Sequence, residues 1–135
     1  QYIYEEGFRV VPIAMLRQDL EVSQDLGGAI ATALKGKDGI IIASSDFTHY
    51  EPQSVASKKD QSALEAILSL GPKQLEDVIS KHNISMCGPG PVMTMLIACR
   101  ELGANKACLL RYVTSGDVTG DYSQVVGYAS LEVTT

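Results

Sequence analysis

A short apolar run, GIIIASS at Gly39–Ser45, is the most marked hydrophobic pattern in the chain. Its short length and its three consecutive isoleucines favour a strand buried on both faces of an α/β sheet over a helix. Three polar side chains follow almost at once: Asp46, Thr48 and His49. In open α/β sheets, ligands bind beyond the carboxyl ends of the strands. The pattern therefore predicts a carboxylate and an imidazole at the place where such folds bind their ligands.

Apolar residues recur at helical spacing in four other parts of the chain. Residues typical of helix termini support these predictions: Asp19 is suited to an N-cap, and Gly36 and Gly103 to helix ends. The four predicted helices are Asp19–Gly36, Gln53–Leu70, Lys73–His82 and Val92–Leu102. In the second of them, four charged residues are interpreted as the solvated face: Lys58, Lys59, Asp60 and Glu65.

Three further strands are predicted, at Phe8–Leu16, Lys106–Val113 and Gln124–Val133. Pro12 lacks an amide donor, so the first of these strands is expected at a sheet edge or at a bulge. Helices lie between the early strands, and this order predicts an α/β fold with a mixed, largely parallel sheet that is flanked by helices. Glycine and aspartate dominate the segment Ser115–Asp121, which favours a tight turn between the last two strands over a cation site.

Length and composition narrow the functional classes. With 135 residues, 45% of them hydrophobic, the chain has the size and composition of one globular domain. A net charge of −5 and the lack of a lysine or arginine cluster argue against binding to nucleic acid or to an anionic membrane. No apolar stretch reaches the ~20 residues that a membrane span needs. Three cysteines without CxxC spacing favour a reducing, cytoplasmic location over a disulfide framework.

His49 and Asp46 are the first candidates for chemistry. A histidine three residues after an aspartate is typical of a general acid or base, or of a metal ligand, that a carboxylate orients. Structural alternatives remain open at this point: His49 caps the next helix or binds loop backbone, and Asp46 ends the strand in an Asx turn. The second histidine, His82, is explained by a favourable position at the C-terminal end of a helix.

Cys87 is the next candidate, because it precedes a GPGP sequence and the helix that follows. The positive end of the helix dipole favours the thiolate, which is the form that binds metal or attacks an electrophile. Glycines on its carboxyl side allow close approach to the backbone. The structural alternative is a small buried residue at a tight turn. Cys99 and Cys108, inside an apolar helix and an apolar strand, are interpreted as inert core residues.

Several motifs occur in one order: SSDFTHYE, then MCGPGPV ahead of an apolar helix ending in ELG, then SGDVTGD and VVGYAS. This set closely resembles the carboxyl-terminal half of the Memo family, whose fold is similar to that of class III extradiol dioxygenases. The resemblance covers the chain from about Gly7 onward, and it implies that residues 1–135 are the carboxyl-terminal portion of a single Memo-like domain. The opening sequence, Gln1–Glu6, fits the last turns of a helix that Gly7 ends.

The resemblance also implies a site. Memo-like proteins have a pocket for a redox-active metal, iron or copper, with two histidine ligands from the amino-terminal half and one cysteine from the carboxyl-terminal half. Cys87 matches that cysteine, His49 matches the pocket histidine that serves as acid or base in the dioxygenases, and Asp46 matches the acidic residue beside it. The two histidine ligands have no counterpart here, so the metal site of this chain is expected to be incomplete.

Three functions follow from these residues. The first is a Memo-like, metal-dependent oxidoreductase or dioxygenase-like enzyme acting on a small molecule, in which Cys87 binds iron or copper. His49 and Asp46 would be its catalytic residues. The second is a non-catalytic module that binds a peptide or a small ligand, and the third is a cysteine hydrolase or transferase that uses Cys87 and His49. In each case, uncovered apolar faces predict association with a missing amino-terminal half or with another copy.

Overall fold

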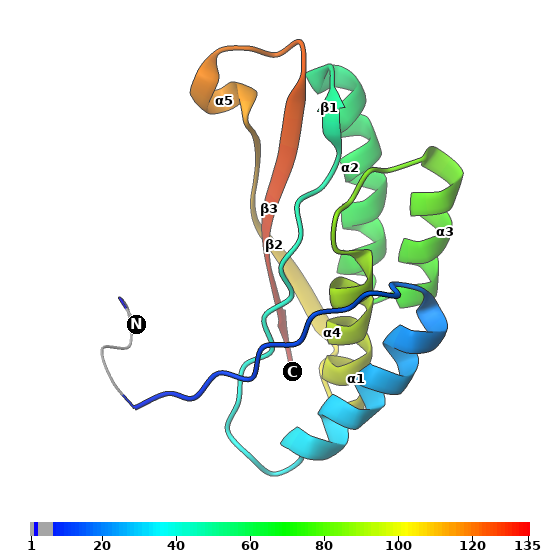
Figure 1. The fold of residues 1–135 in the computed structure, drawn as a ribbon, viewed down its shortest axis with the longest axis vertical. Helices are drawn as coiled ribbons and strands as arrows, with labels where there is room; N and C mark the ends of the chain where they lie inside the picture. The colour runs from blue at the N-terminus through cyan, green and yellow to red at the C-terminus, as the bar shows by residue number, and fades with distance from the viewer. Residues whose placement is uncertain (1, 3–6) are drawn as a thin grey trace.

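Helices and strands follow one another along the chain in the computed structural model, which describes Tyr2 and residues 7–135 (Figure 1). The helices are α1 (Leu20–Leu34), α2 (Gln53–Leu68), α3 (Pro72–His82), α4 (Pro89–Glu101) and α5 (Gly116–Thr119), and the strands are β1 (His49–Glu51), β2 (Lys106–Thr114) and β3 (Val125–Thr134). The structure is an α/β fold, as predicted. The helical turns predicted at Gln1–Glu6 fall outside the described residues, apart from Tyr2.

The four predicted helices are all present, with changes at their ends. Asp19 caps α1 as predicted: its Oδ1 accepts a hydrogen bond from Val22 N at 3.0 Å, and this bond lowers the pKa of Asp19. Helix α4 begins at Pro89 rather than at Val92, because both prolines of GPGP fit in a first turn, where no amide donor is needed. No helix of the described residues is long and apolar enough to span a membrane.

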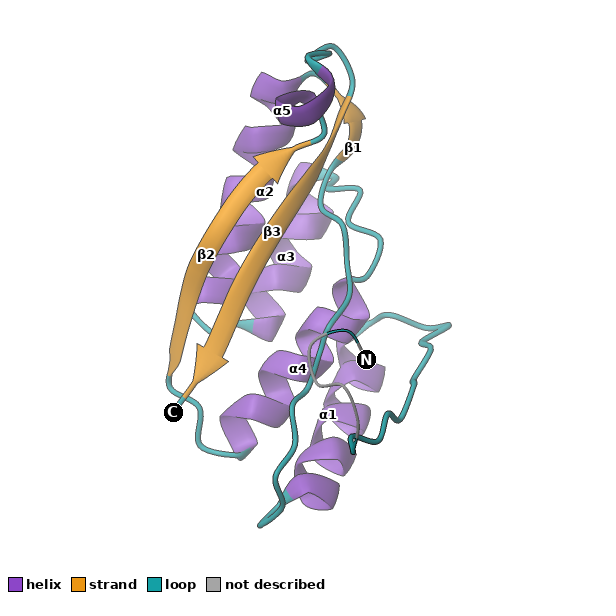
Figure 2. Cartoon of the chain, turned by 90° about the vertical axis from the view of Figure 1, so that its left-hand side faces the viewer, coloured by secondary structure: helices purple, strands orange, loops and turns teal. Residues whose placement is uncertain are grey.

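The sheet is antiparallel throughout, so the prediction of a largely parallel sheet is wrong. The strand order is β1-β3-β2, and β3 runs antiparallel to both neighbours. β2 and β3 pair from Lys106 with Thr134 to Thr114 with Gly127, and Figure 2 shows them side by side as a long ribbon in front of the helices. The connection between these two strands is short, and short connections produce antiparallel pairs because a parallel pair needs a long crossover.

The connection between β2 and β3 contains the one-turn helix α5. Two aspartates of this connection accept hydrogen bonds from nearby backbone amides. Asp117 Oδ2 accepts from Thr114 N at 2.7 Å, and Asp121 Oδ1 accepts from Ser123 N at 2.9 Å. Hydrogen bonds from the Ser123 side chain and backbone hold the pKa of Asp121 below its usual value. These bonds support the interpretation of Ser115–Asp121 as a connection between strands.

The strand predicted at Gly39–Ser45 is not formed, and neither is the one predicted at Phe8–Leu16. No backbone amide or carbonyl of Gly39–Ser45 makes a hydrogen bond within the described part of the chain. Ile40 and Ile42 are 76% and 85% exposed, whereas the isoleucine between them is half-buried. The run therefore has the side-chain alternation of a strand but lacks the hydrogen-bonded neighbour that defines one.

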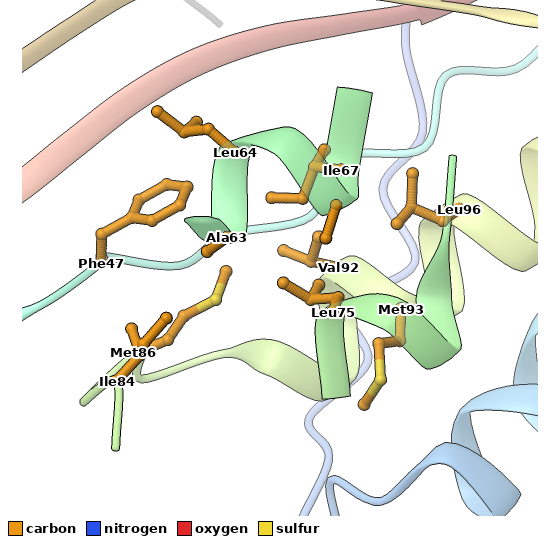
Figure 3. Packing of buried hydrophobic residues seen from close by; sticks show 11 residues of the cluster. Phe47, Ala63, Leu64, Ile67, Leu75, Ile84, Met86, Val92, Met93 and Leu96 are labelled. Carbon is orange, nitrogen blue, oxygen red and sulfur yellow. The ribbon is translucent and has the colours of Figure 1, made fainter. Parts of the chain in front are cut away.

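The hydrophobic core lies between α2, α3 and α4 and one face of the sheet (Figure 3). Its buried residues are Phe47, Ala63, Leu64, Ala66, Ile67, Leu75, Ile84, Met86, Val92, Met93 and Leu96. Three of them, Phe47, Ile84 and Met86, belong to loops rather than to helices or strands. The core thus holds the residue next to Asp46 and the residue next to Cys87.

Asp60 of α2 is fully buried, so its interpretation as part of the solvated face is wrong. Its Oδ1 accepts a hydrogen bond from Thr48 N at 3.0 Å, and its Oδ2 accepts one from Tyr112 Oη at 2.7 Å. Burial, and then the bond to Asp60, raise the pKa of Tyr112, so the phenol remains a donor. A Cβ atom at Gly127 would lie 1.9 Å from Asp60 Oδ2. The carboxylate therefore links α2 to the loop before β1, to β2 and to β3.

We predict that Gly127→Ala destabilises the fold by about 2–3 kcal/mol, because the added methyl group must displace the Asp60 carboxylate from its two partners. Urea unfolding measures this change in the free energy of unfolding. Gly28→Ala is the matched control in α1, where the nearest atoms to a new Cβ are the Glu101 carboxylate oxygens at 3.7 and 3.8 Å. It is expected to leave stability unchanged or to raise it by up to about 1 kcal/mol. Equal stability of Gly127→Ala and wild type would contradict the contact.

Candidate functional site

Two loops lie side by side and bring the predicted site residues together. One is the segment 45–49, which leads into β1, and the other is the segment 84–88 between α3 and α4. Cys87 N donates to the carbonyl of Asp46 at 3.3 Å, and Asp46 N donates to Cys87 Sγ at 3.0 Å. His49 N donates to Ser85 Oγ at 2.7 Å. Residues that are about forty positions apart in the sequence are thus hydrogen-bonded neighbours.

His49 is held with one nitrogen bound and the other available. Its Nδ1 lies 2.8 Å from the carbonyl oxygen of Ser85, and because a carbonyl only accepts, Nδ1 carries the hydrogen. Nε2 is then the nitrogen with the free lone pair, and it lies 3.8 Å from Asp46 Oδ2. The imidazole side chain is mostly buried, and the carboxylate is half-exposed. This arrangement suits a proton carrier that can reach a ligand at the surface of the molecule.

A β-bulge follows His49 directly. His49 pairs with Val126 and Glu51 with Val125, so Tyr50 is an extra residue in β1. Tyr50 has a φ of 57°, in the left-handed region that a side chain such as tyrosine rarely adopts. Bulges of this kind redirect neighbouring side chains and are common beside functional sites. Nothing in the sequence signalled the bulge, because tyrosine is not a typical residue for it.

Cys87 lies at the surface, with its sulfur against the loop 45–49. Ser45 Oγ is 3.7 Å from Cys87 Sγ, accepts from Gly88 N at 2.9 Å, and donates to the Asp46 carbonyl at 2.8 Å. A Cβ at Gly88 would lie 2.6 Å from the carbonyl oxygen of Ser44, so the glycine permits this close approach. The alternative of a small buried residue is wrong for Cys87, although the tight turn is present.

The other candidate residues lie apart from this pair of loops. Cys99 is half-buried in α4, and burial raises the pKa of its thiol, in agreement with a core role. Cys108 is exposed on β2, so its interpretation as a core residue is wrong: alternate residues of this strand face solvent. His82 is exposed in the last turn of α3, as expected.

The side chains that the structure describes do not form a complete metal site. No group of three or more His, Cys, Asp or Glu residues able to hold an ion occurs among the described residues. Zinc sites in proteins use three or four protein ligands, and iron(II) oxygenases use two histidines with a carboxylate. Cys87 can offer one thiolate ligand, but any metal bound there needs further ligands from outside the described residues.

An apolar cleft of about 900 Å³ adjoins the site. Its lining comes from the segment Gly39–Ser45, from α2 and α4, and from the sheet. It includes Ile41, Ala43, Ile67, Met95 and Leu131. Ser45, Phe47 and Met86 also line the cleft, and each is a chain neighbour of Asp46 or Cys87. A ligand with an apolar portion can therefore lie in the cleft with its polar end near the two loops.

Three residues contact the site without having been predicted from the sequence: Ser45, Ser85 and Gln18. Ser45 and Ser85 bind the site through their hydroxyl groups and, for Ser85, its carbonyl. The Gln18 side chain reaches the Cys87 loop with hydrogen bonds to the Cys87 carbonyl and the Gly90 amide. Serine and glutamine are common surface residues, so only the three-dimensional contacts show their part in the site.

Comparison with known proteins places this chain in a family. The profile of the Memo-like protein family matches residues 1–132. A MEMO1 family protein of Methanopyrus kandleri is 45% identical over 133 residues, which are 97% of this chain and 47% of the relative. A MEMO1 family protein of Methanocaldococcus jannaschii is 54% identical over 128 residues, 93% of this chain and 45% of the relative. The chain spans about half the length of these curated relatives. With almost its whole length matched, the chain belongs to the Memo family.

Proposed function

We propose that this chain carries part of the reactive pocket of a metal-dependent oxidoreductase or dioxygenase-like enzyme of the Memo family. The observation that carries the proposal is the pairing of the loops 45–49 and 84–88, with Asp46 bound to Cys87 and close to His49. A thiol, an imidazole and a carboxylate at one surface position, beside an apolar cleft, are the parts of a reactive pocket rather than of a packed core.

Each residue has a separate role in this proposal. Cys87 supplies a thiolate ligand, which suits iron or copper, and such a metal would supply redox chemistry to a small-molecule substrate. His49 accepts or donates a proton at Nε2, since its Nδ1 is engaged by the Ser85 carbonyl. Asp46 orients the imidazole from 3.8 Å. A cytoplasmic location would keep the exposed thiols of Cys87 and Cys108 reduced.

The missing metal ligands would come from a segment outside this chain. The curated relatives are about twice as long as the matched region, so a further polypeptide of similar length is available in proteins of this kind. We propose that this segment, the amino-terminal half that the Memo resemblance implies, supplies the remaining ligands and covers the exposed face at Gly39–Ser45. The unpaired backbone of that run is suited to a strand added alongside it.

A binding module without catalysis is the second candidate function. The cleft of about 900 Å³ favours it, because a cleft of this size takes a small ligand or the side chains of a peptide. In this version Cys87 and His49 contact the ligand but transfer nothing. The two functions differ in one respect that can be measured, since binding by such a module does not require a metal.

The first prediction from this proposal concerns the metal. In a protein extended to the length of its relatives, iron(II) or copper(I) is expected to bind at one equivalent, and Cys87→Ser is expected to weaken binding more than about tenfold, since a ligand is lost. Isothermal titration with metal analysis measures both. Cys108→Ser is the matched control, because Cys108 is also exposed but lies on β2. The chain of residues 1–135 alone is expected to bind more weakly.

The outcomes separate the two candidates. Unchanged metal affinity in Cys87→Ser would show that the thiolate assignment is wrong. Tight binding of a small ligand or peptide after complete removal of metal would favour the binding module instead.

The second prediction concerns the exposed apolar run. The chain alone is expected to self-associate and to bind an apolar dye, because Ile40 and Ile42 are exposed together on one edge. Ile42→Asp should reduce both signals in light scattering and dye fluorescence. Val118→Asp is the control, as Val118 is 88% exposed but lies on α5. A monomer without dye binding at high concentration would contradict the prediction, and so would equal effects of the two variants.

A further inference from the structure

Gln18, which precedes the N-cap of α1, holds the Cys87 loop with both ends of its side-chain amide. Gln18 Nε2 donates to the Cys87 carbonyl at 3.2 Å, and Gln18 Oε1 accepts from Gly90 N at 3.1 Å. A primary amide has a donor and an acceptor side by side, which matches a carbonyl and an amide presented by one loop. The two contacts span the residues from the site thiol to the first turn of α4.

The start of α4 has a shortage of capping groups that Gln18 meets. Its N-cap residue, Gly88, has no side chain with which to cap, and the first turn contains Pro89 and Pro91, which lack an amide hydrogen. Val92 N donates to the Gly88 carbonyl at 3.4 Å. Gly90 N is the remaining amide donor of the first turn that has no partner within α4, and Gln18 Oε1 accepts from it. Gln18 therefore acts as the cap of α4, although it lies 72 positions earlier in the chain.

The fit between Gln18 and the loop is close. A Cβ at Gly90 would lie 2.9 Å from both Gln18 Cα and Gln18 Cβ, so the second glycine of GPGP is needed for this contact. Ser23 Oγ also reaches the Gly90 carbonyl at 3.3 Å and the Asp19 carbonyl at 2.9 Å. The beginning of α1 is thus bonded to the beginning of α4 through several groups.

These contacts fix Cys87 on the side that Asp46 does not reach. The amide of Cys87 donates to the Asp46 carbonyl, its sulfur accepts from Asp46 N, and its carbonyl accepts from Gln18. We propose that Gln18 is a positioning residue, which keeps the Cys87 sulfur against Asp46 N by holding the opposite end of the same residue. This inference rests on the proposed function only in assigning the Cys87 sulfur a role as a metal ligand.

Hydrogen exchange of single amides, measured by NMR, tests the inference without a metal. Gln18→Met removes both contacts at similar length, and the amides of Gly90 and Asp46 are each expected to exchange about five- to tenfold faster. The Asp46 amide is the decisive readout, because Gln18 does not touch it and a purely local loss at Gly90 would leave it unchanged. Phe47 N, bonded to the Gly127 carbonyl at 2.9 Å, should be unaffected.

Two further variants complete the test. Gln18→Glu keeps an acceptor for Gly90 N but replaces the donor to the Cys87 carbonyl, so Gly90 should stay protected while Asp46 exchanges faster. Gln24→Met is the matched control at an exposed position of α1 and should change neither amide. Unchanged exchange of Asp46 in both Gln18 variants would overturn the inference.

Metal affinity of the extended protein then separates the inference from the proposed function. If Cys87→Ser abolishes binding but Gln18→Met changes neither affinity nor Asp46 exchange, the function holds and the role of Gln18 is wrong. If the Asp46 amide exchanges faster as expected but no variant changes the metal affinity, Gln18 positions the sulfur and the metal function is wrong.

Discussion

The buried carboxylate of Asp60 is the interaction on which the rest of the structure depends. A buried charge is costly unless hydrogen bonds satisfy it, and Asp60 has donors from two other parts of the chain, Thr48 N and the Tyr112 hydroxyl. Thr48 lies between Asp46 and His49, so the donor that satisfies Asp60 also fixes the backbone of the site loop. β3 adds its own bonds to the same loop, from Phe47 N to the Gly127 carbonyl and from Gly127 N to the Thr48 carbonyl. The requirement to satisfy one carboxylate therefore orders the residues that carry the chemistry.

The candidate site is positioned from two independent sides. Asp46 and His49 are held against α2 and β3 by the two residues between them, Phe47 and Thr48. Cys87 is held against α1 and α4 by Gln18 and the glycines of GPGP. The reciprocal bonds between Asp46 and Cys87 are the place where these two supports meet.

The helices were predictable because their signals are local: periodic apolar residues and a capping aspartate define α1. Local sequence pattern also named Asp46, His49 and Cys87 as candidates, and the structure brings these three residues together. Contacts between distant residues were not predictable. Asp60 stands next to two lysines and was assigned to the solvated face, but its burial depends on Tyr112, 52 positions away. The isoleucines of Gly39–Ser45 predicted a strand buried on both faces, which is wrong: Ile40 and Ile42 are exposed, and strand formation depends on a neighbour that the run itself does not specify.

The segment Gly39–Ser45 and the candidate site are continuous in the chain. A strand that paired with this segment would therefore also act on the site. Gly39–Ser45 leads directly into Asp46, and the Ser45 hydroxyl binds both the Asp46 carbonyl and Gly88 N. Gly39–Ser45 makes no backbone hydrogen bond to the residues that the structure describes, and fixing the backbone of a residue costs about 1–2 kcal/mol of conformational entropy, so this run keeps more freedom than a paired strand. A strand added along Ile40 and Ile42 would remove that freedom on the amino-terminal side of Asp46. Completion of the sheet and precise placement of the thiol would then be a single event, in which whatever covers the exposed run also sets the geometry of the pocket.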